Sequence, residues 1–351
     1  MKISEWLDEE SEKEGILALT QKVFGEQEIT QPSYFDWQYR INPQGKALIL
    51  LAKDESKNEK IIGTNVLIPI NLIIEKKAIR SSLACNVQVD PTYRGQGIFS
   101  KLLGSMKEYA EKNGVLYFYA VPNKKSFNAF IRQGAVKITS LPILVRPLNF
   151  SKFFNSPLQR IFKLFDWMWK INSVENSKIN LFTDDFSEEF ETFSNKATQR
   201  IPIMVKRDVS FFRWRYHSCP TRKYKIFTLK EDSQLKGYII TRITKFEEKT
   251  IGVIVDFLVD DEIRDKKSLK DLVNTALLDL IHNGASVAIA TCNKRFLEST
   301  ILHETRFFSV PNSFKPQQLN FISSSFTQDE YVKKLANYDN WFFSFGDYDI
   351  F

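Results

Sequence analysis

The chain of 351 residues is longer than one typical domain, and its hydrophobic content of 43% is enough for two packed cores. Three cysteines without a CxxC pair and three scattered histidines exclude a disulfide framework and a zinc cluster. The net charge of +7 suits binding of an anionic small molecule, but no Lys/Arg tract is long enough to predict nucleic-acid binding.

The N-terminal residues contain no apolar signal-peptide segment. No apolar run reaches the roughly 18 residues that a membrane-spanning helix needs. We therefore expect a cytoplasmic protein without a transmembrane segment. The oligomeric state has no signature in the sequence.

In chain order, the first distinctive pattern is an aromatic segment at 35–43, Phe-x-Trp-x-Tyr-x-x-x-Pro. A strand is predicted at 46–53, and a second strand begins at Gly63. The alternating apolar residues of a third strand end at Asp90, which is followed by proline.

A glycine turn over Arg94–Gly97 follows that strand, and a helix begins directly after it with an apolar face that includes Ile98 and Leu102. Such a turn predicts an anion site, because the N–H groups of the helix's first turn and the helix dipole both favour negative charge. Gly95 and Gly97 let the backbone approach a phosphate, and Arg94 adds a charged donor. A strand at 114–121 and a short helix at 126–133, closed by Gly134, come next.

This succession resembles the acyl-CoA-binding signature of the GNAT superfamily of N-acetyltransferases, Arg/Gln-x-x-Gly-x-Gly/Ala. Arg94 and Gly97 occupy its first two fixed positions, whereas Phe99 stands where the family usually has Gly or Ala. The resemblance implies a GNAT fold with acetyl-CoA as cofactor. It also implies a set of cofactor-binding residues along the strand, the turn and the following helix: Val87, Gln88, Val89, Arg94, Gly95, Gln96, Gly97, Ile98, Phe99, Ser100, Asn123, Ser126 and Phe130.

The chain also repeats itself. The aromatic pattern of 35–43 recurs at 212–220, the strand end at 86–90 recurs at 256–260, and Asn-Gly and Asn-Lys pairs follow in the same order. The second copy lacks the glycine turn and has acidic residues after Asp260, such as Asp261 and Glu262, where a pyrophosphate would lie. We therefore expect the second copy to keep the fold and to have lost the anion site.

These observations predict an α/β (α+β) chain of two tandem GNAT-like domains, each with a mixed, mainly antiparallel sheet flanked by helices. The first domain is expected at 1–150 and the second, degenerate one at 179–351, with an aromatic and acidic C-terminal tail. Between them, 151–178 predicts an amphipathic helix, interpreted as a connection packed on both domains; the alternative is an anchor at a membrane surface.

The catalytic acid and base have no clear candidate in the sequence. Many GNAT enzymes use a tyrosine four residues before the glycine that closes the second helix, and this chain has Phe130 there. Weak candidates are Asn86 and Gln88, and also Asp347 and Asp349, which the tail could place near the acceptor. Strand alternation predicts Asn86, Gln88 and Asp90 on one face and Cys85, Val87 and Val89 on the other.

The reading favoured by the sequence is an acetyl-CoA-dependent N-acetyltransferase acting on a primary amine of a small molecule. Resemblance of the tail to that of prokaryotic double-GNAT proteins points to an amino sugar of surface-polysaccharide synthesis. The absent hydroxyl at Phe130 keeps a non-catalytic acyl-CoA-binding or interaction module as an alternative. A Fem-like aminoacyl-tRNA-dependent transferase is a further alternative, disfavoured by the retained glycine turn.

Overall fold

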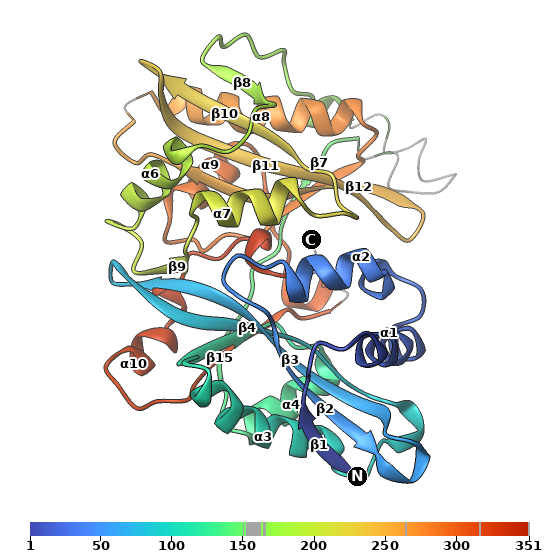
Figure 1. Ribbon diagram of the computed structural model, residues 1–351. Helices are drawn as coiled ribbons and strands as arrows, with labels where there is room; N and C mark the ends of the chain where they lie inside the picture. The colour runs from blue at the N-terminus through green and yellow to red at the C-terminus, as the bar shows by residue number, and fades with distance from the viewer. Residues whose placement is uncertain (150, 152–162, 164–165, 264, 316, 350–351) are drawn as a thin grey trace. The chain divides into compact units, whose positions relative to one another are not determined.

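The structure is a computed structural model that describes residues 1–149, 151, 163, 166–263, 265–315 and 317–349. It contains two compact units, each built on one sheet (Figure 1). Unit 1 consists of residues 1–140, 218–221 and 317–340, and unit 2 of the described residues within 141–217, 222–315 and 341–349. No helix of the described residues is long and apolar enough to cross a membrane.

The sheet of unit 1 has the strand order β1-β2-β3-β4-β5-β15-β6. Along this order the pairings are antiparallel except that of β4 with β5, which is parallel. The strands are β1 (Lys2–Glu5), β2 (Leu48–Asp54), β3 (Lys60–Ile74), β4 (Lys77–Val89), β5 (Tyr117–Ala120), β6 (Val136–Ser140) and β15 (Asn320–Ser325).

The sheet of unit 2 has the order β8-β10-β11-β12-β13-β7-β14, again with one parallel pairing, between β12 and β13. Its strands are β7 (Leu144–Pro147), β8 (Ile179–Phe182), β10 (Lys225–Glu231), β11 (Gln234–Phe246), β12 (Lys249–Val259), β13 (Val287–Ala290) and β14 (Phe308–Ser309). The residues of unit 2 also include the short strand β9 (Ile203–Val205), which is not one of the strands of this sheet.

Helices complete each unit in the same sequence. Unit 1 has α1 (Glu10–Phe24), α2 (Pro32–Phe35), α3 (Ile98–Lys112), α4 (Lys124–Arg132) and α10 (Tyr331–Leu335), and unit 2 has α6 (Glu188–Ala197), α7 (Val209–Phe212), α8 (Lys266–His282) and α9 (Leu297–Glu304). The aromatic repeats at 35–43 and 212–220 adopt one local structure, because α2 and α7 each continue into a five-residue π-helix, Asp36–Arg40 and Arg213–His217.

The two copies exchange their penultimate sheet strands, which corrects the expected boundaries at 150 and 179. Strand β7 follows β6 in the chain but pairs with β13 in the sheet of unit 2. Strand β15, close to the C-terminus, inserts between β5 and β6 in unit 1. Each sheet is therefore completed by a strand from the other half of the sequence, and neither expected range contains a whole sheet.

The expected connecting helix at 151–178 lies partly outside the described residues, at 152–162 and 164–165. Of the described part, Asp166–Trp169 forms a short 3-10 turn. Residues 170–178 contain no helix. The predicted helix therefore does not extend to β8.

A bulge in β4 changes which side chains face the core of unit 1. Thr64 pairs with Gln88 and Val66 with Cys85, so that Asn86 and Val87 lie opposite a single residue of β3. Ala84, Val87 and Val89 consequently face the α3 side of the sheet, where they pack with Leu102 and Met106. The expected grouping of Cys85 with Val87 and Val89 is wrong, because the extra residue shifts the alternation by one position.

Helix α3 lies close against β3 at Gly63. A Cβ atom there would be 3.0 Å from Leu102 Cδ1 and 3.2 Å from the carbonyl oxygen of Gln88. In unit 2, a Cβ on Gly237 would be 3.4 Å from Leu272 Cδ2. Both copies therefore use glycine where a helix packs on the strand, and the approach is tighter in unit 1.

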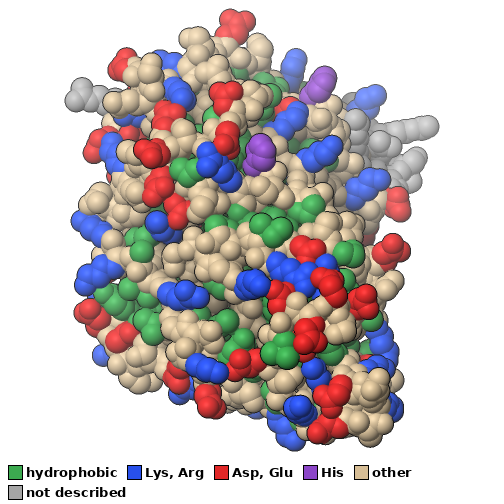
Figure 2. All heavy atoms as spheres, viewed as in Figure 1, with side chains coloured by type: hydrophobic (Ala, Val, Ile, Leu, Met, Phe, Trp, Pro, Cys, Tyr) green, Lys and Arg blue, Asp and Glu red, His purple; other side chains and the backbone are tan. Residues whose placement is uncertain are grey.

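On the face in Figure 2, basic and acidic side chains are intermixed around small hydrophobic patches.

We predict that Gly63→Ala lowers the free energy of unfolding by about 1–3 kcal/mol, because the added methyl group overpacks a tight contact. Gly237→Ala should cost less, since its nearest contacts are at 3.3–3.4 Å. Gly104→Ala, at an exposed position in α3, should instead stabilise by about 0.5–1 kcal/mol. Urea unfolding of the three variants tests this order, and equal losses at Gly63 and Gly104 would contradict it.

Candidate functional site

The glycine turn joins β4 to α3 through two residues with left-handed backbones. Gly95 has φ +80° and Gly97 has φ +74°, a region that residues with a Cβ rarely adopt. Apart from the adjoining residues of the chain, no atom of the described residues lies within 4 Å of a Cβ built at either position. Arg94, Gly95, Gln96 and Gly97 are all exposed. The turn thus leaves open space in front of the helix.

The first turn of α3 has no side-chain cap. Its N-cap is Gly97, and the first helical bond runs from the Lys101 N–H to the Gly97 carbonyl. The N–H groups of Ile98, Phe99 and Ser100 precede that bond and point out of the helix end, where the positive end of the dipole also lies. This arrangement favours an anion such as a phosphate.

The carboxylate of Asp90 fixes the start of the glycine turn. It accepts hydrogen bonds from the Thr92 N–H at 2.9 Å and from Lys22 Nζ of α1 at 2.7 Å. Although burial acts to raise it, these bonds hold the pKa of Asp90 at about 2. The buried carboxylate ties the end of β4 to α1 and fixes where the turn begins. Unit 2 has the same arrangement, with Lys196 of α6 on Asp260 at 3.0 Å.

Strands β4 and β5 part beside the turn. Their parallel pairing covers Ser81–Leu83 with Tyr117–Tyr119, and β4 then continues to Val89 without further pairing to β5 in this register. The end of β4 around Val87 and Val89 thus lies beyond the β4–β5 ladder, where an extended ligand with amide groups could pair with the strand. Cofactor candidates Val87 and Val89 lie on this part of the strand.

The bulge in β4 lies in the same stretch. Asn86 has φ +48°, which asparagine tolerates better than most residues. Its Nδ2 donates to the Tyr39 hydroxyl at 2.6 Å, and its carbonyl accepts from Thr64 Oγ1 at 3.1 Å. Both contacts hold the strained residue in place. Tyr39, from the aromatic repeat, was missed as a site residue, and its counterpart Tyr216 could have indicated it.

The other cofactor candidates divide between an exposed turn and the core. Asn123 caps α4 and accepts from the Lys125 and Ser126 N–H groups at 2.9 and 3.1 Å. Phe130 is buried, and its ring meets Phe99 edge-on with centroids 6.4 Å apart. The two departures from the GNAT pattern therefore touch each other, and a second aromatic ring occupies the place beside Phe130 where the family usually has a small residue.

Gln88 is not exposed at the turn. Its side chain is buried against α1, where Nε2 donates to Thr20 Oγ1 at 2.8 Å. Its position between Val87 and Val89 in the strand places it on the side of the sheet away from α3. A groove of about 570 Å³ also borders α1, but its lysines pair with carboxylates of the same groove, Lys53 with Glu12 and Lys22 and Lys60 with Asp90.

Unit 2 fills the equivalent places with its own side chains. Asp265 caps α8 by accepting from the Lys267 and Ser268 N–H groups. At the end of β12, the Val259 N–H donates to Glu298 Oε1 at 3.1 Å and the Val259 carbonyl accepts from Arg200 at 2.8 Å. The polar groups that the equivalent strand of unit 1 leaves available are thus satisfied within the protein.

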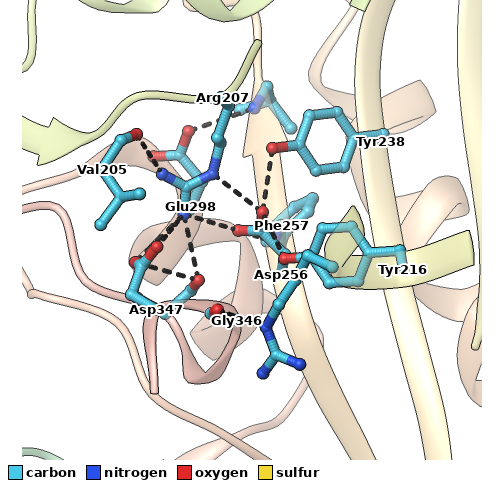
Figure 3. A network of polar contacts seen from close by, with 12 residues as sticks. Val205, Arg207, Tyr216, Tyr238, Asp256, Phe257, Glu298, Gly346 and Asp347 are labelled. Atoms are coloured by element: carbon cyan, nitrogen blue, oxygen red, sulfur yellow. Dashed lines mark hydrogen bonds and ion pairs between the residues drawn. The ribbon is translucent and has the colours of Figure 1, made fainter. Parts of the chain in front are cut away.

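The C-terminal tail completes this filling, as Figure 3 shows. Asp347 is buried and receives Arg207 Nη2 at 3.0 Å, and Arg207 also pairs with Asp256 at 2.9 Å. Tyr216 and Tyr238 donate to the same Asp256 carboxylate at 3.2 and 3.1 Å. Burial and the nearby Asp256 raise the pKa of Asp347, although Arg207 opposes the shift.

The tail therefore packs as an ordered element, as expected from its aromatic residues. Trp341, Phe342, Phe343 and Phe345 are all buried in unit 2. The cavity left beside Asp256, Glu298 and Phe342 measures about 10 Å³, room for one water at most. The carboxylate of Asp347 is committed to Arg207, and the Asp349 carbonyl accepts from Arg222 at 2.8 Å.

The chain is similar to known proteins in sequence and in structure. Residues 8–129 match the family profile described as an acetyltransferase (GNAT) domain. No curated protein matches the sequence. A GCN5-related N-acetyltransferase from Anabaena variabilis is similar in structure, with a TM-score of 0.65 and 10% identity, over 93% of this chain and 73% of that one.

Two further structures extend this likeness. The N-myristoyltransferase of Saccharomyces cerevisiae, solved with bound myristoyl-CoA, has a TM-score of 0.63 and 13% identity over 92% of this chain and 82% of its own. A probable N-acyltransferase from Enterococcus faecalis has a TM-score of 0.61 and 12% identity over 92% and 72%. The fold of two mainly antiparallel sheets flanked by helices is therefore the GNAT-like fold of these proteins.

We predict that Asp90→Asn lowers the free energy of unfolding at pH 7 by about 1–2 kcal/mol, a range that allows for the half-exposed Lys22. Because the folded-state pKa is depressed, the carboxylate stabilises above the unfolded value near 4 and loses this effect as the pH falls toward about 2. The difference from wild type should shrink over that interval in urea unfolding. Asp184→Asn, at an exposed carboxylate, is the control; a loss at Asp90 independent of pH would contradict the account.

Proposed function

We propose that this chain, as a GNAT-type acyltransferase, transfers an acetyl group from acetyl-CoA to a primary amine of a small molecule. One observation carries the proposal. In unit 1 an uncapped helix N-terminus lies behind two glycines with open space in front of them, whereas unit 2 caps its helix with Asp265. Of the two helix starts, the one in unit 1 is therefore the one suited to a pyrophosphate.

The residues of unit 1 fit the cofactor in two places. The N–H groups of Ile98, Phe99 and Ser100 and the guanidinium of Arg94 would hold the pyrophosphate. The backbone of Val87 and Val89, beyond the β4–β5 pairing, would hold the amide groups of the pantetheine arm. When bound, acetyl-CoA supplies a thioester whose carbonyl carbon forms a bond with the amine nitrogen as the carbon–sulfur bond breaks and the sulfur leaves with a proton.

The bulge is the structural basis for catalysis in this proposal. It turns the backbone around Asn86 and Val87 out of the β3–β4 ladder, and an N–H group at such a place can donate to an oxygen that gains charge during acyl transfer. Tyr39 holds the bulge through Asn86 Nδ2 and is therefore a positioning residue. Proximity then supplies the remaining catalysis, because Phe130 has no hydroxyl group to donate a proton.

The acceptor is proposed to be an amino sugar, in keeping with the Trp…Gly-Asp-x-Asp ending of the chain. The burial of Phe130 against Phe99 favours a second candidate, a non-catalytic acyl-CoA-binding module. The two differ in turnover: both bind acetyl-CoA, but only the enzyme releases the CoA thiol when an amine is present.

The first test of the proposal is acetyl-CoA binding by calorimetric titration. Wild type should bind one equivalent per chain with micromolar affinity, and Gly97→Glu should abolish binding because a carboxylate would lie where the pyrophosphate is expected. Gly25→Glu is a matched control, since Gly25 has φ +76°, equally open space and the same change of charge at a helix end. Absence of binding to wild type would sink the proposal, and an equal loss in Gly25→Glu would remove the site from the glycine turn.

The second test separates positioning from stability. With the best acceptor from a panel of amino sugars and small amines, Tyr39→Phe should lower kcat about tenfold and leave the KM for acetyl-CoA within twofold. Tyr216→Phe, which removes the matching hydroxyl in unit 2, should destabilise by about 1–3 kcal/mol without changing kcat. Asn86→Gly should be tolerated better than Asn86→Val, because glycine adopts positive φ readily. Equal kcat values for Tyr39→Phe and wild type would contradict the role of Tyr39.

A further inference from the structure

A cavity of about 380 Å³ in unit 2 lies apart from the glycine turn and has no role in the proposed acetyl transfer. Strand β7, helix α8 and the turn after α9 line it together with residues 170–174. Its volume is in the range of small-molecule sites. Its basic lining residues are Arg146, Lys170, Lys267, Lys270 and Arg306.

Arg146 is the buried member of this cavity. It is 3% exposed, and its guanidinium donates to the Thr305 carbonyl and, at 3.4 Å, to Asn274 Oδ1. Its Nε is buried and has no hydrogen-bond partner among the described residues. Burial, with repulsion from Arg306, lowers the pKa of Arg146 to about 10.

No carboxylate of the described residues neutralises this arginine. Among the residues that the structure describes, no Asp or Glu forms an ion pair with Arg146, and none contributes to its pKa. The remaining residues of the chain, at 150, 152–162, 164–165, 264, 316 and 350–351, include no Asp or Glu side chain. A buried unpaired charge is costly, so a position of this kind normally has a counter-ion.

The fold itself does not require an arginine at this place. Strand β7 in unit 2 corresponds to β15 in unit 1, where Leu144 pairs with Ala290 and Ile322 with Ala120. In this register Arg146 corresponds to Ser324, a half-buried serine. The same sheet position is thus filled by a small neutral residue in the other copy, and the buried charge is particular to unit 2.

The other basic residues leave the cavity with an excess of positive charge. Its two acidic residues already have lysine partners, Asp271 with Lys267 at 2.8 Å and Glu304 with Lys270 at 3.6 Å. Arg306, exposed at the rim, donates to the Met168 carbonyl, which is a neutral partner. Arg146, Lys170 and Arg306 therefore have no acidic partner among the described residues.

We propose that this cavity is a phosphate-binding site, with Arg146 at its base and Lys170, Lys270 and Arg306 around it. The ligand is a phosphate-bearing small molecule or a phospholipid headgroup, two sources of the same chemistry. A buried arginine favours phosphate because its planar guanidinium can present paired donors, including the unpartnered Nε. Trp167, which is 74% exposed in the turn just before Lys170, lies where fluorescence would report binding.

The test is a calorimetric titration of inorganic pyrophosphate at constant ionic strength. It uses the Gly97→Glu background, so that the glycine turn cannot contribute. We expect one saturable site per chain, at least tenfold weaker in Arg146→Met and about threefold to tenfold weaker in Lys270→Gln. Lys107→Gln, an exposed lysine in α3, should bind as the parent does. Without saturable binding of pyrophosphate or vesicles, or with affinity unchanged in both cavity variants, the proposal fails.

A second arm identifies the source of the phosphate. Sedimentation with phosphatidylglycerol vesicles, compared with phosphatidylcholine vesicles, should show binding that Arg146→Met and Lys270→Gln remove if the ligand is a headgroup. Pyrophosphate binding without vesicle binding assigns a soluble ligand, and both outcomes support the site. If Arg146→Met does not fold, Lys270→Gln and Arg306→Gln decide: unchanged pyrophosphate and vesicle binding in these two variants would overturn the proposal.

Discussion

The proposed anion site depends on the unsatisfied N–H groups at the start of helix α3. Every helix begins with such groups, and a protein must meet them with a side chain, water or a ligand. Unit 1 places glycine at the N-cap, with no side-chain bond and open space in front. Unit 2 places Asp265 there and satisfies the groups itself. One cap residue thus separates an anion site from a closed helix end in two copies of the same fold.

Unit 2 differs from unit 1 in further polar contacts near this helix start. The polar groups at the end of β12 have partners within the protein, which Glu298 and Arg200 supply. Where unit 1 has the neutral pair Asn86 and Tyr39, unit 2 has Asp256 with Tyr216 and a buried Arg207. The tail adds Asp347 to that arginine. The copy without the proposed site therefore has the additional buried ion pairs.

The sequence predicted the features that local pattern determines. The glycine turn, the following helix and the lack of that turn in the second copy were readable because glycine and acidic residues have direct backbone and charge effects. The exchange of β7 and β15 was not, since strand pairing between distant segments leaves no local signal. The bulge at Asn86 was missed for a related reason: one extra residue shifts the alternation without changing its composition. Tyr39 was missed as well, because its role depends on its hydrogen bond with Asn86 in the bulge.

Hydrogen exchange with and without acetyl-CoA reports on both helix starts in one experiment, and so shows which of them binds the cofactor. Bound acetyl-CoA should slow exchange in peptides that cover the glycine turn and the start of α3, at 94–103. It should also slow exchange along β5 and at the start of α4. No change is expected at 260–270, where Asp265 already caps α8. Protection at 260–270, or none at 94–103, would contradict the assignment of the site to the first copy.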